Sequence, residues 1–226
     1  MTIASRYAAV QKRVQESLAR AGRPSDDLVI VAVAKTFPIP IILEALDAGV
    51  TDIGENRPQE LKEKAIAIGP RARWHLVGPL QTNKVRSVVG VVELIHSVDR
   101  YGLGEAIARR ARAVGIVQSV LVEVNLAQEA SKHGVPPTQA IALAEDLSRL
   151  EGLEVRGLMS IPPRRSNPDD TRGDFRGLAA LCREMRAHVS GATELSMGMS
   201  RDFDIAIEEG STIVRVGEAI FGARSR

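Results

Sequence analysis

The stretch Leu28–Ala34 (LVIVAVA) is a continuous apolar run, and Lys35 follows it directly. A strand of this composition is buried on both faces, as strands are in a parallel sheet that helices cover. Pro38 and Pro40 open the next segment, in which apolar residues recur at helical spacing as far as Gly49. The stretch therefore predicts a βα unit with a lysine at the carboxyl end of its strand.

The same alternation continues along the chain. Further strands are predicted at Thr51–Gly54, Arg73–Val77, Leu94–Ser97, Val117–Val124, Leu153–Met159, Glu194–Ser196 and Thr212–Val216. Further helices are predicted at Pro58–Ile68, Thr82–Val88, Arg100–Val114, Pro137–Leu150, Asp170–Val189 and Asp202–Glu209. Eight βα units in a chain of 226 residues predict a (β/α)₈ barrel, an α/β fold. A doubly wound open sheet is the alternative that this pattern leaves open.

One helix precedes the first strand. Its apolar stripe consists of Tyr7, Val10, Val14, Leu18 and Ala21. We expect residues 1–22 to form a helix that packs on the barrel. No linker rich in Pro, Gly or Ser divides the chain, so residues 1–226 are predicted to form a single domain.

Composition excludes several classes of protein. Hydrophobic residues make up 44% of the chain and charged residues 26%, which argues against general disorder. Aromatic residues make up only 3%, so the core must be aliphatic, and a net charge of +2 without basic, aromatic-rich stretches argues against nucleic-acid binding. Cys182 is the single cysteine, the four histidines lack metal-ligand spacing, and no long apolar segment is present. We expect a cytoplasmic protein with no metal, no membrane contact and no nucleic-acid partner.

Polar residues and glycines cluster where the predicted strands end. They include Lys35, Glu55, Asn56, Gly78, Gln81, Ser97, Asn125, Met159, Ser160, Ser196, Met199, Ser200, Arg215 and Gly217. In a (β/α)₈ barrel the carboxyl ends of the strands meet at one mouth, where the functional loops lie. The prediction is that these residues surround a single site.

Lys35 admits two interpretations at this point. A lysine at the end of an apolar strand is partly desolvated, which lowers its pKa and leaves an amine that can form a Schiff base with an aldehyde. The alternative is a lysine that extends to the surface. The segments Gly198–Ser200 and Gly217 lie after the last two strands, where barrels often bind phosphate. Together these features suggest a ligand with an aldehyde at one end and a phosphate at the other.

Long motifs in this sequence resemble those of the pyridoxal 5′-phosphate homeostasis proteins, whose barrel is similar to the N-terminal domain of alanine racemase. The matching stretches are Val31–Thr36 (VAVAKT), Gly54–Arg57 (GENR), Trp74–Lys84 (WHLVGPLQTNK), Ile95–Asp99 (IHSVD), Val122–Asn125 (VEVN), Glu129–Gly134 (EASKHG), Gly157–Pro162 (GLMSIP) and Leu195–Arg224. The resemblance spans nearly the whole chain. Leu76, where relatives often carry Phe, departs from it without touching a proposed role.

The resemblance implies a barrel of fold-type III that holds pyridoxal 5′-phosphate (PLP) as a Schiff base on Lys35. It implies phosphate binding by Ser200 and Gly217 with help from the backbone of Met199, and it implies that Arg215 lies near the pyridine nitrogen.

The resemblance also implies that Asn56 and Ser160 line the cofactor pocket and that Lys132 is a second lysine near the site. The implied partners are PLP and unidentified acceptor proteins that receive it. The chain has no residues left for a second domain, so we expect a monomer.

The same residues bear on catalysis. An arginine at the pyridine nitrogen disfavours protonation there and weakens the cofactor as an electron sink. Racemases with the similar fold need a second acid/base on the face of the cofactor opposite the lysine, and a tyrosine from a second domain and a second subunit supplies it. This chain has only Tyr7 and Tyr101. We expect a PLP carrier or homeostasis protein with little or no catalysis and assign no catalytic residue. A PLP-dependent amino-acid racemase and a cofactor-free lyase that uses Lys35 are the alternatives.

Overall fold

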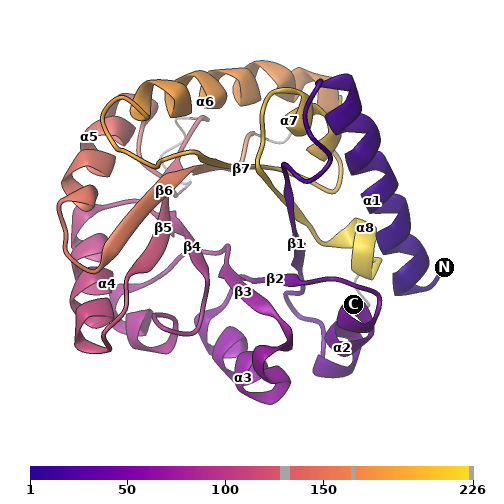
Figure 1. The fold of residues 1–226 in the computed structure, drawn as a ribbon, viewed down its shortest axis with the longest axis horizontal. Coiled ribbons are helices and arrows are strands. Elements are labelled where there is room, and N and C mark those ends of the chain that lie inside the picture. Colours follow the sequence, from indigo (N-terminus) through magenta and orange to yellow (C-terminus); the bar gives the residue numbers. More distant parts are fainter. Residues whose placement is uncertain (128–132, 164–165, 224–226) are drawn as a thin grey trace.

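A computed structural model describes residues 1–127, 133–163 and 166–223 of the chain. Eight parallel strands pair in chain order and close into a barrel, because β8 pairs back with β1 (Figure 1). The strands are β1 (Val29–Val33), β2 (Asp52–Glu55), β3 (Arg73–Leu76), β4 (Leu94–Val98), β5 (Gln118–Val124), β6 (Leu153–Ser160), β7 (Glu194–Met199) and β8 (Ile213–Val216). The predicted (β/α)₈ barrel is confirmed, and the open-sheet alternative is wrong because no strand of the described chain lies at a free edge.

Helices cover the outside of the barrel (Figure 1). They are α1 (Ile3–Arg20), α2 (Ile39–Asp47), α3 (Pro58–Ile68), α4 (Tyr101–Ala113), α5 (Pro137–Ser148), α6 (Arg172–Met185), α7 (Phe203–Glu208) and α8 (Glu218–Phe221). Three 3₁₀ segments are η1 (Gly69–Arg71), η2 (Thr82–Ser87) and η3 (Pro168–Thr171). None of the helices in the described ranges combines the length and hydrophobicity needed to span a bilayer.

Two predicted helices differ from the structure. The segment predicted at Thr82–Val88 is the 3₁₀ segment η2, in which Val85 alone is buried, so no apolar stripe is present to stabilise an α-helix. The helix predicted at Asp170–Val189 begins two residues later and ends at Met185. Asp170 belongs to η3, and the chain turns at Gly191, which has a φ of 84°.

The N-terminal helix α1 packs against α2, α7 and α8. Thr2 caps its first turn by accepting a hydrogen bond from the Ser5 backbone N–H. Its buried residues are Ile3, Tyr7, Val10, Val14, Ser17 and Leu18, which confirms the predicted stripe except for Ala21, the cap residue at its end. Arg13 and Arg20 form ion pairs with Asp204 and Glu208 of α7.

The buried apolar residues form two clusters, one inside the barrel and one between the strands and the surrounding helices. The larger cluster lies between the strands and the helices. The smaller cluster fills the interior, and its buried members are Val31, Val77, Leu94, Leu121, Met159 and Ile213. Because side chains alternate along a strand, the polar residues His75, His96 and Arg215 also face the interior. The interior is therefore partly apolar and partly a buried polar network.

Candidate functional site

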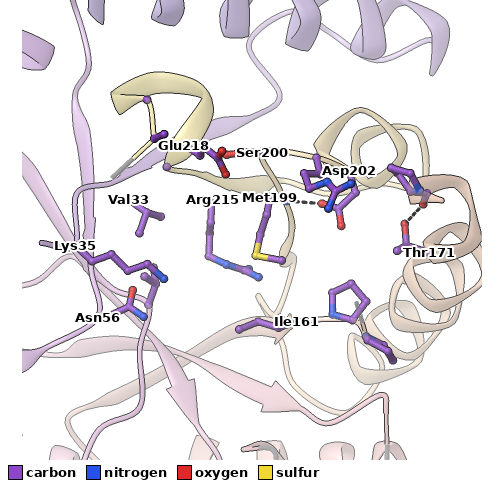
Figure 2. A pocket seen from close by; sticks show the side chains of 18 of the residues that line it. Val33, Lys35, Asn56, Ile161, Thr171, Met199, Ser200, Asp202, Arg215 and Glu218 are labelled. Carbon is purple, nitrogen blue, oxygen red and sulfur yellow. Dashed lines mark hydrogen bonds between the residues drawn. The ribbon is translucent and has the colours of Figure 1, made fainter. Parts of the chain in front are cut away.

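A cavity of about 550 Å³ lies at the carboxyl ends of the strands. We call it the carboxyl-end cavity. It brings together six of the seven residues assigned to the cofactor from the sequence: Lys35, Asn56, Met199, Ser200, Arg215 and Gly217. Lys35 and Asn56 lie on one side of it, and Arg215 and Met199 project into it from another (Figure 2). Its volume is within the usual range for small-molecule sites.

Ser160 is the assigned residue that does not line the carboxyl-end cavity. Its side chain is fully buried and donates a hydrogen bond of 2.6 Å to the Val124 carbonyl. Its own carbonyl accepts a hydrogen bond of 2.9 Å from Arg215 Nη2. Ser160 therefore supports Arg215 through its backbone and does not present its hydroxyl to the cavity.

Lys35 lies in a tight turn after β1. The Phe37 N–H donates to the Ala34 carbonyl over 3.1 Å and closes the turn. Thr36 has a φ of 70°, a left-handed conformation that is costly for a β-branched residue. The turn directs the half-buried Lys35 side chain into the carboxyl-end cavity (Figure 2). The strained turn fixes the point at which the Lys35 side chain enters the cavity.

Lys64 ties together the strand ends that carry Lys35 and Asn56. Lys64 belongs to α3, and its Nζ lies 2.5 Å from Glu55 Oε1 and 3.2 Å from the Ala34 carbonyl oxygen. Burial raises the pKa of Glu55, and the Lys64 ammonium opposes that shift. The ion pair fixes the residue before Lys35 and the residue before Asn56 at the same point.

Arg215 is held deep in the barrel and is only 4% exposed. Its Nη1 donates to Ser196 Oγ over 2.6 Å, and its Nη2 donates to the Ser160 carbonyl. Burial lowers the pKa of Arg215 to about 10, against the raising effects of Glu123 and Asp202. The guanidinium therefore remains charged at neutral pH and presents donors, never an acceptor, to the cavity.

The loops after β7 and β8 form the opposite side of the cavity. Ser200 Oγ accepts a hydrogen bond of 3.3 Å from the Ala219 N–H of α8. Gly198, near the end of β7, has a φ of 90°, and a Cβ there would lie 2.6 Å from Ala206 Cβ, so a side chain would push the end of β7 away from α7. A Cβ on Gly217 would lie 3.1 Å from the Val33 carbonyl oxygen. The glycines thus keep both loops close to the barrel.

Glu123 is a buried carboxyl of the barrel interior that sequence reasoning missed. Burial, with a smaller contribution from Asp99, raises its pKa to about 7, although Arg215 acts in the opposite direction. Because this pKa is above the unfolded value, Glu123 favours folding fully at low pH. The contribution is lost as the pH rises through the interval between 4.5 and about 7.

We therefore expect Glu123→Gln to stabilise the protein at alkaline pH. At about pH 8 the gain in the free energy of unfolding is at most about 3 kcal/mol, and it vanishes near pH 4. Urea unfolding at several pH values measures it, with Glu105→Gln on the exposed face of α4 as the control. A pH-independent difference would contradict the assignment.

Comparisons with known proteins place the chain in a family. Residues 6–225 match the family described as "Alanine racemase, N-terminal domain". The pyridoxal phosphate homeostasis protein of Aquifex aeolicus is 43% identical over 226 residues, which cover 99% of each chain. The chain belongs to the pyridoxal phosphate homeostasis protein family. The homeostasis protein of Pseudomonas aeruginosa is 39% identical, with 99% of this chain and 96% of that protein covered.

A solved structure extends the comparison to a ligand-bound family relative. PipY of Synechococcus elongatus, solved with PLP bound, superposes with a TM-score of 0.85 at 35% identity. The match covers 98% of this chain and all of PipY. The resemblance read from the sequence motifs is thereby confirmed at the level of the homeostasis family.

Three sequence expectations remain apart from this site. Lys132 lies outside the described residues. Tyr7 is buried on α1, as expected of a packing residue, and Tyr101 is 46% exposed at the start of α4. The period-2 pattern of the strands could have placed His75 and His96 inside the barrel, but nothing in the sequence indicated Lys64.

Proposed function

We propose that this protein binds PLP in the carboxyl-end cavity and holds it on Lys35 as a carrier in PLP homeostasis, with little or no catalysis. The observation that supports the proposal is the set of groups around one cavity. The amine comes from the turn after β1, the guanidinium from β8, and the hydroxyl from the loop after β7, close to Gly217. They match the aldehyde, the pyridine ring and the phosphate of PLP.

The residues present fit PLP chemically. Its aldehyde needs an amine, which Lys35 supplies. Its phosphate needs donors, which the Ser200 hydroxyl and the loop backbone around Gly217 supply without a side chain in the way. Its ring nitrogen can accept a hydrogen bond from Arg215. Asn56 lies across the cavity from Met199, where it would contact the ring (Figure 2).

When bound, PLP supplies an aldehyde that can condense with a primary amine, releasing one water molecule and forming a C=N bond. Lys35 would supply this amine. Arg215, which can only donate, would face the ring nitrogen and would leave it unprotonated. These roles suit retention and release of the cofactor better than carbanion chemistry.

The racemase alternative is less well supported. Both tyrosines lie in the described part of the chain, and neither lines the carboxyl-end cavity. Tyr7 instead lines a cavity of about 340 Å³ at the amino ends of the strands. Asp202 does line the site, but its Oδ1 accepts a hydrogen bond of 2.7 Å from the Met199 N–H, which suits a structural role in the loop.

A direct test uses purified protein with PLP. We expect a yellow complex, and borohydride reduction followed by peptide mapping should place the label on Lys35. Chiral analysis after incubation with amino acids should show no rapid racemisation. A colourless protein would contradict PLP binding, and rapid racemisation would contradict the carrier function.

Ser200→Ala is expected to weaken binding of PLP but not of pyridoxal, which lacks the phosphate. Loss of one hydrogen bond to a charged group corresponds to an affinity loss of roughly tenfold to a hundredfold. Fluorescence titration with both ligands measures this difference. An equal loss for both ligands would place Ser200 away from the phosphate.

We further propose that the chain works as a single barrel domain and as a monomer in the cytoplasm. Its partners would be PLP and acceptor proteins rather than nucleic acid or a membrane. Sedimentation at several protein concentrations tests the monomer, and transfer of PLP to an apoenzyme tests the acceptor.

A further inference from the structure

A chain of hydrogen bonds runs through the barrel interior and ends at Arg215. Asp52 Oδ1 lies 3.0 Å from His75 Nε2, and His75 Nδ1 lies 3.0 Å from His96 Nε2. His96 Nδ1 lies 2.9 Å from Ser196 Oγ, which lies 2.6 Å from Arg215 Nη1. All five side chains are buried. We call them the barrel relay.

The barrel relay crosses the barrel from end to end. It takes one residue from each of β2, β3, β4, β7 and β8. Asp52 lines the cavity at the amino ends of the strands, and Arg215 lines the carboxyl-end cavity. It therefore connects the PLP site proposed above to the opposite face of the barrel.

The chemistry of the side chains fixes the direction of the bonds at the two ends. Arg215 can only donate, so Ser196 Oγ accepts from it. The ionised Asp52 carboxylate can only accept, so His75 donates to it from Nε2. Between these ends the two rings share one proton, on His75 Nδ1 or on His96 Nε2, and Ser196 Oγ correspondingly accepts from His96 Nδ1 or donates to it.

The charges agree with that arrangement. Burial alone would raise the pKa of Asp52, but hydrogen bonds from His75, Arg73 and Thr51 hold it well below its usual value. Burial, aided by His75 and Arg215, lowers the pKa of His96 well below its usual value. The barrel relay thus has an anion at one end and a cation at the other, with the neutral His96 and Ser196 next to the cation.

We propose that Asp52, His75, His96 and Ser196 are positioning residues that fix Arg215 toward the ring of bound PLP. The bonds of Arg215 to Ser196 and Ser160 go to neutral oxygens, and three side chains separate it from the relay carboxylate. The guanidinium therefore keeps its charge while its direction is fixed. Without the relay, a long side chain with several rotatable bonds would lose its orientation.

The inference rests on the proposed function, and its first test is Ser196→Ala. This change cuts the relay beside Arg215 and removes only a hydroxyl. We expect PLP affinity to fall roughly tenfold and the visible absorption band of the complex to shift. Ser196→Thr, which keeps the hydroxyl, should restore both.

Ser211→Ala is the matched control. Ser211 is equally buried, and its hydroxyl lies 2.8 Å from the Met197 carbonyl and outside the relay. It should lower the stability to urea without moving the band. If Ser196→Ala behaves in the same way, the relay is only structural and the proposal is overturned. A wild-type protein that binds no PLP would instead overturn the proposed function.

Nitrogen NMR of the ligand-free protein tests the relay in the absence of PLP. We expect His96 to be neutral at about pH 7 and its ring nitrogen signals to change in Ser196→Ala but not in Ser211→Ala. His96 signals that are unchanged in Ser196→Ala would overturn the relay. Its result is independent of whether the cofactor binds.

Discussion

Lys35→Ala is expected to abolish the covalent attachment of PLP. Wild-type protein should retain one label after borohydride reduction, whereas the variant should retain none in the peptide that contains residue 35. Of the described residues that line the carboxyl-end cavity, Lys35 is the one with a primary amine. Ser200 and Arg215 remain, so we expect residual non-covalent binding at an affinity at least about tenfold lower.

Two variants make this result specific. Lys62→Ala removes an exposed lysine of α3 and should leave the label unchanged. Lys132 lies outside the described residues. The double variant Lys35→Ala, Lys132→Ala tests whether Lys132 is a second attachment point for PLP. A full yield of label in Lys35→Ala would contradict the assignment of Lys35.

Lys64→Met is expected to give the largest loss of stability among these substitutions. Lys64 is 8% exposed, and Glu55 is fully buried. Removing the ammonium leaves the Glu55 carboxylate buried without its partner, a change that typically costs 3–5 kcal/mol, and we expect about that loss here. Since Lys64 also binds the Ala34 carbonyl, PLP affinity should fall as well. Urea unfolding and PLP titration measure the two effects.

The neighbouring Lys62 again supplies the control. Lys62→Met lies on the same helix but is exposed, so its effect should remain within about 0.5 kcal/mol. Glu55→Gln together with Lys64→Met should recover part of the loss, because no unpaired buried charge remains. Equal effects of Lys62→Met and Lys64→Met would show that the buried pair contributes nothing.

The strands were predictable because their apolar runs reflect burial on both sides. All eight are present, and α3 has the predicted bounds. β7 extends past the predicted Ser196 to Met199, because Gly198 lets the strand bend against α7. η2 was predicted as a helix because apolar content alone does not distinguish one buried side chain from a continuous stripe.

The candidate site, like the fold, was predictable only in part. Residues that follow strands were predictable, because parallel strands bring their carboxyl ends to one mouth. Lys35, Ser200 and Arg215 line the cavity as expected. Ser160 does not, because its hydroxyl turns to the Val124 carbonyl, and strand position does not set a side-chain hydrogen bond.

The sequence by itself determined the eight βα units and the lysine after β1, because periodicity and position are local properties of the chain, and it left barrel closure and strand order to the tertiary structure. Only the tertiary structure decided which distant polar groups meet. His96 forms hydrogen bonds to both His75 and Ser196, and Lys64 contacts both Glu55 and Ala34, so each set links several strands or helices. Such contacts depend on barrel closure and side-chain direction, which no local pattern encodes.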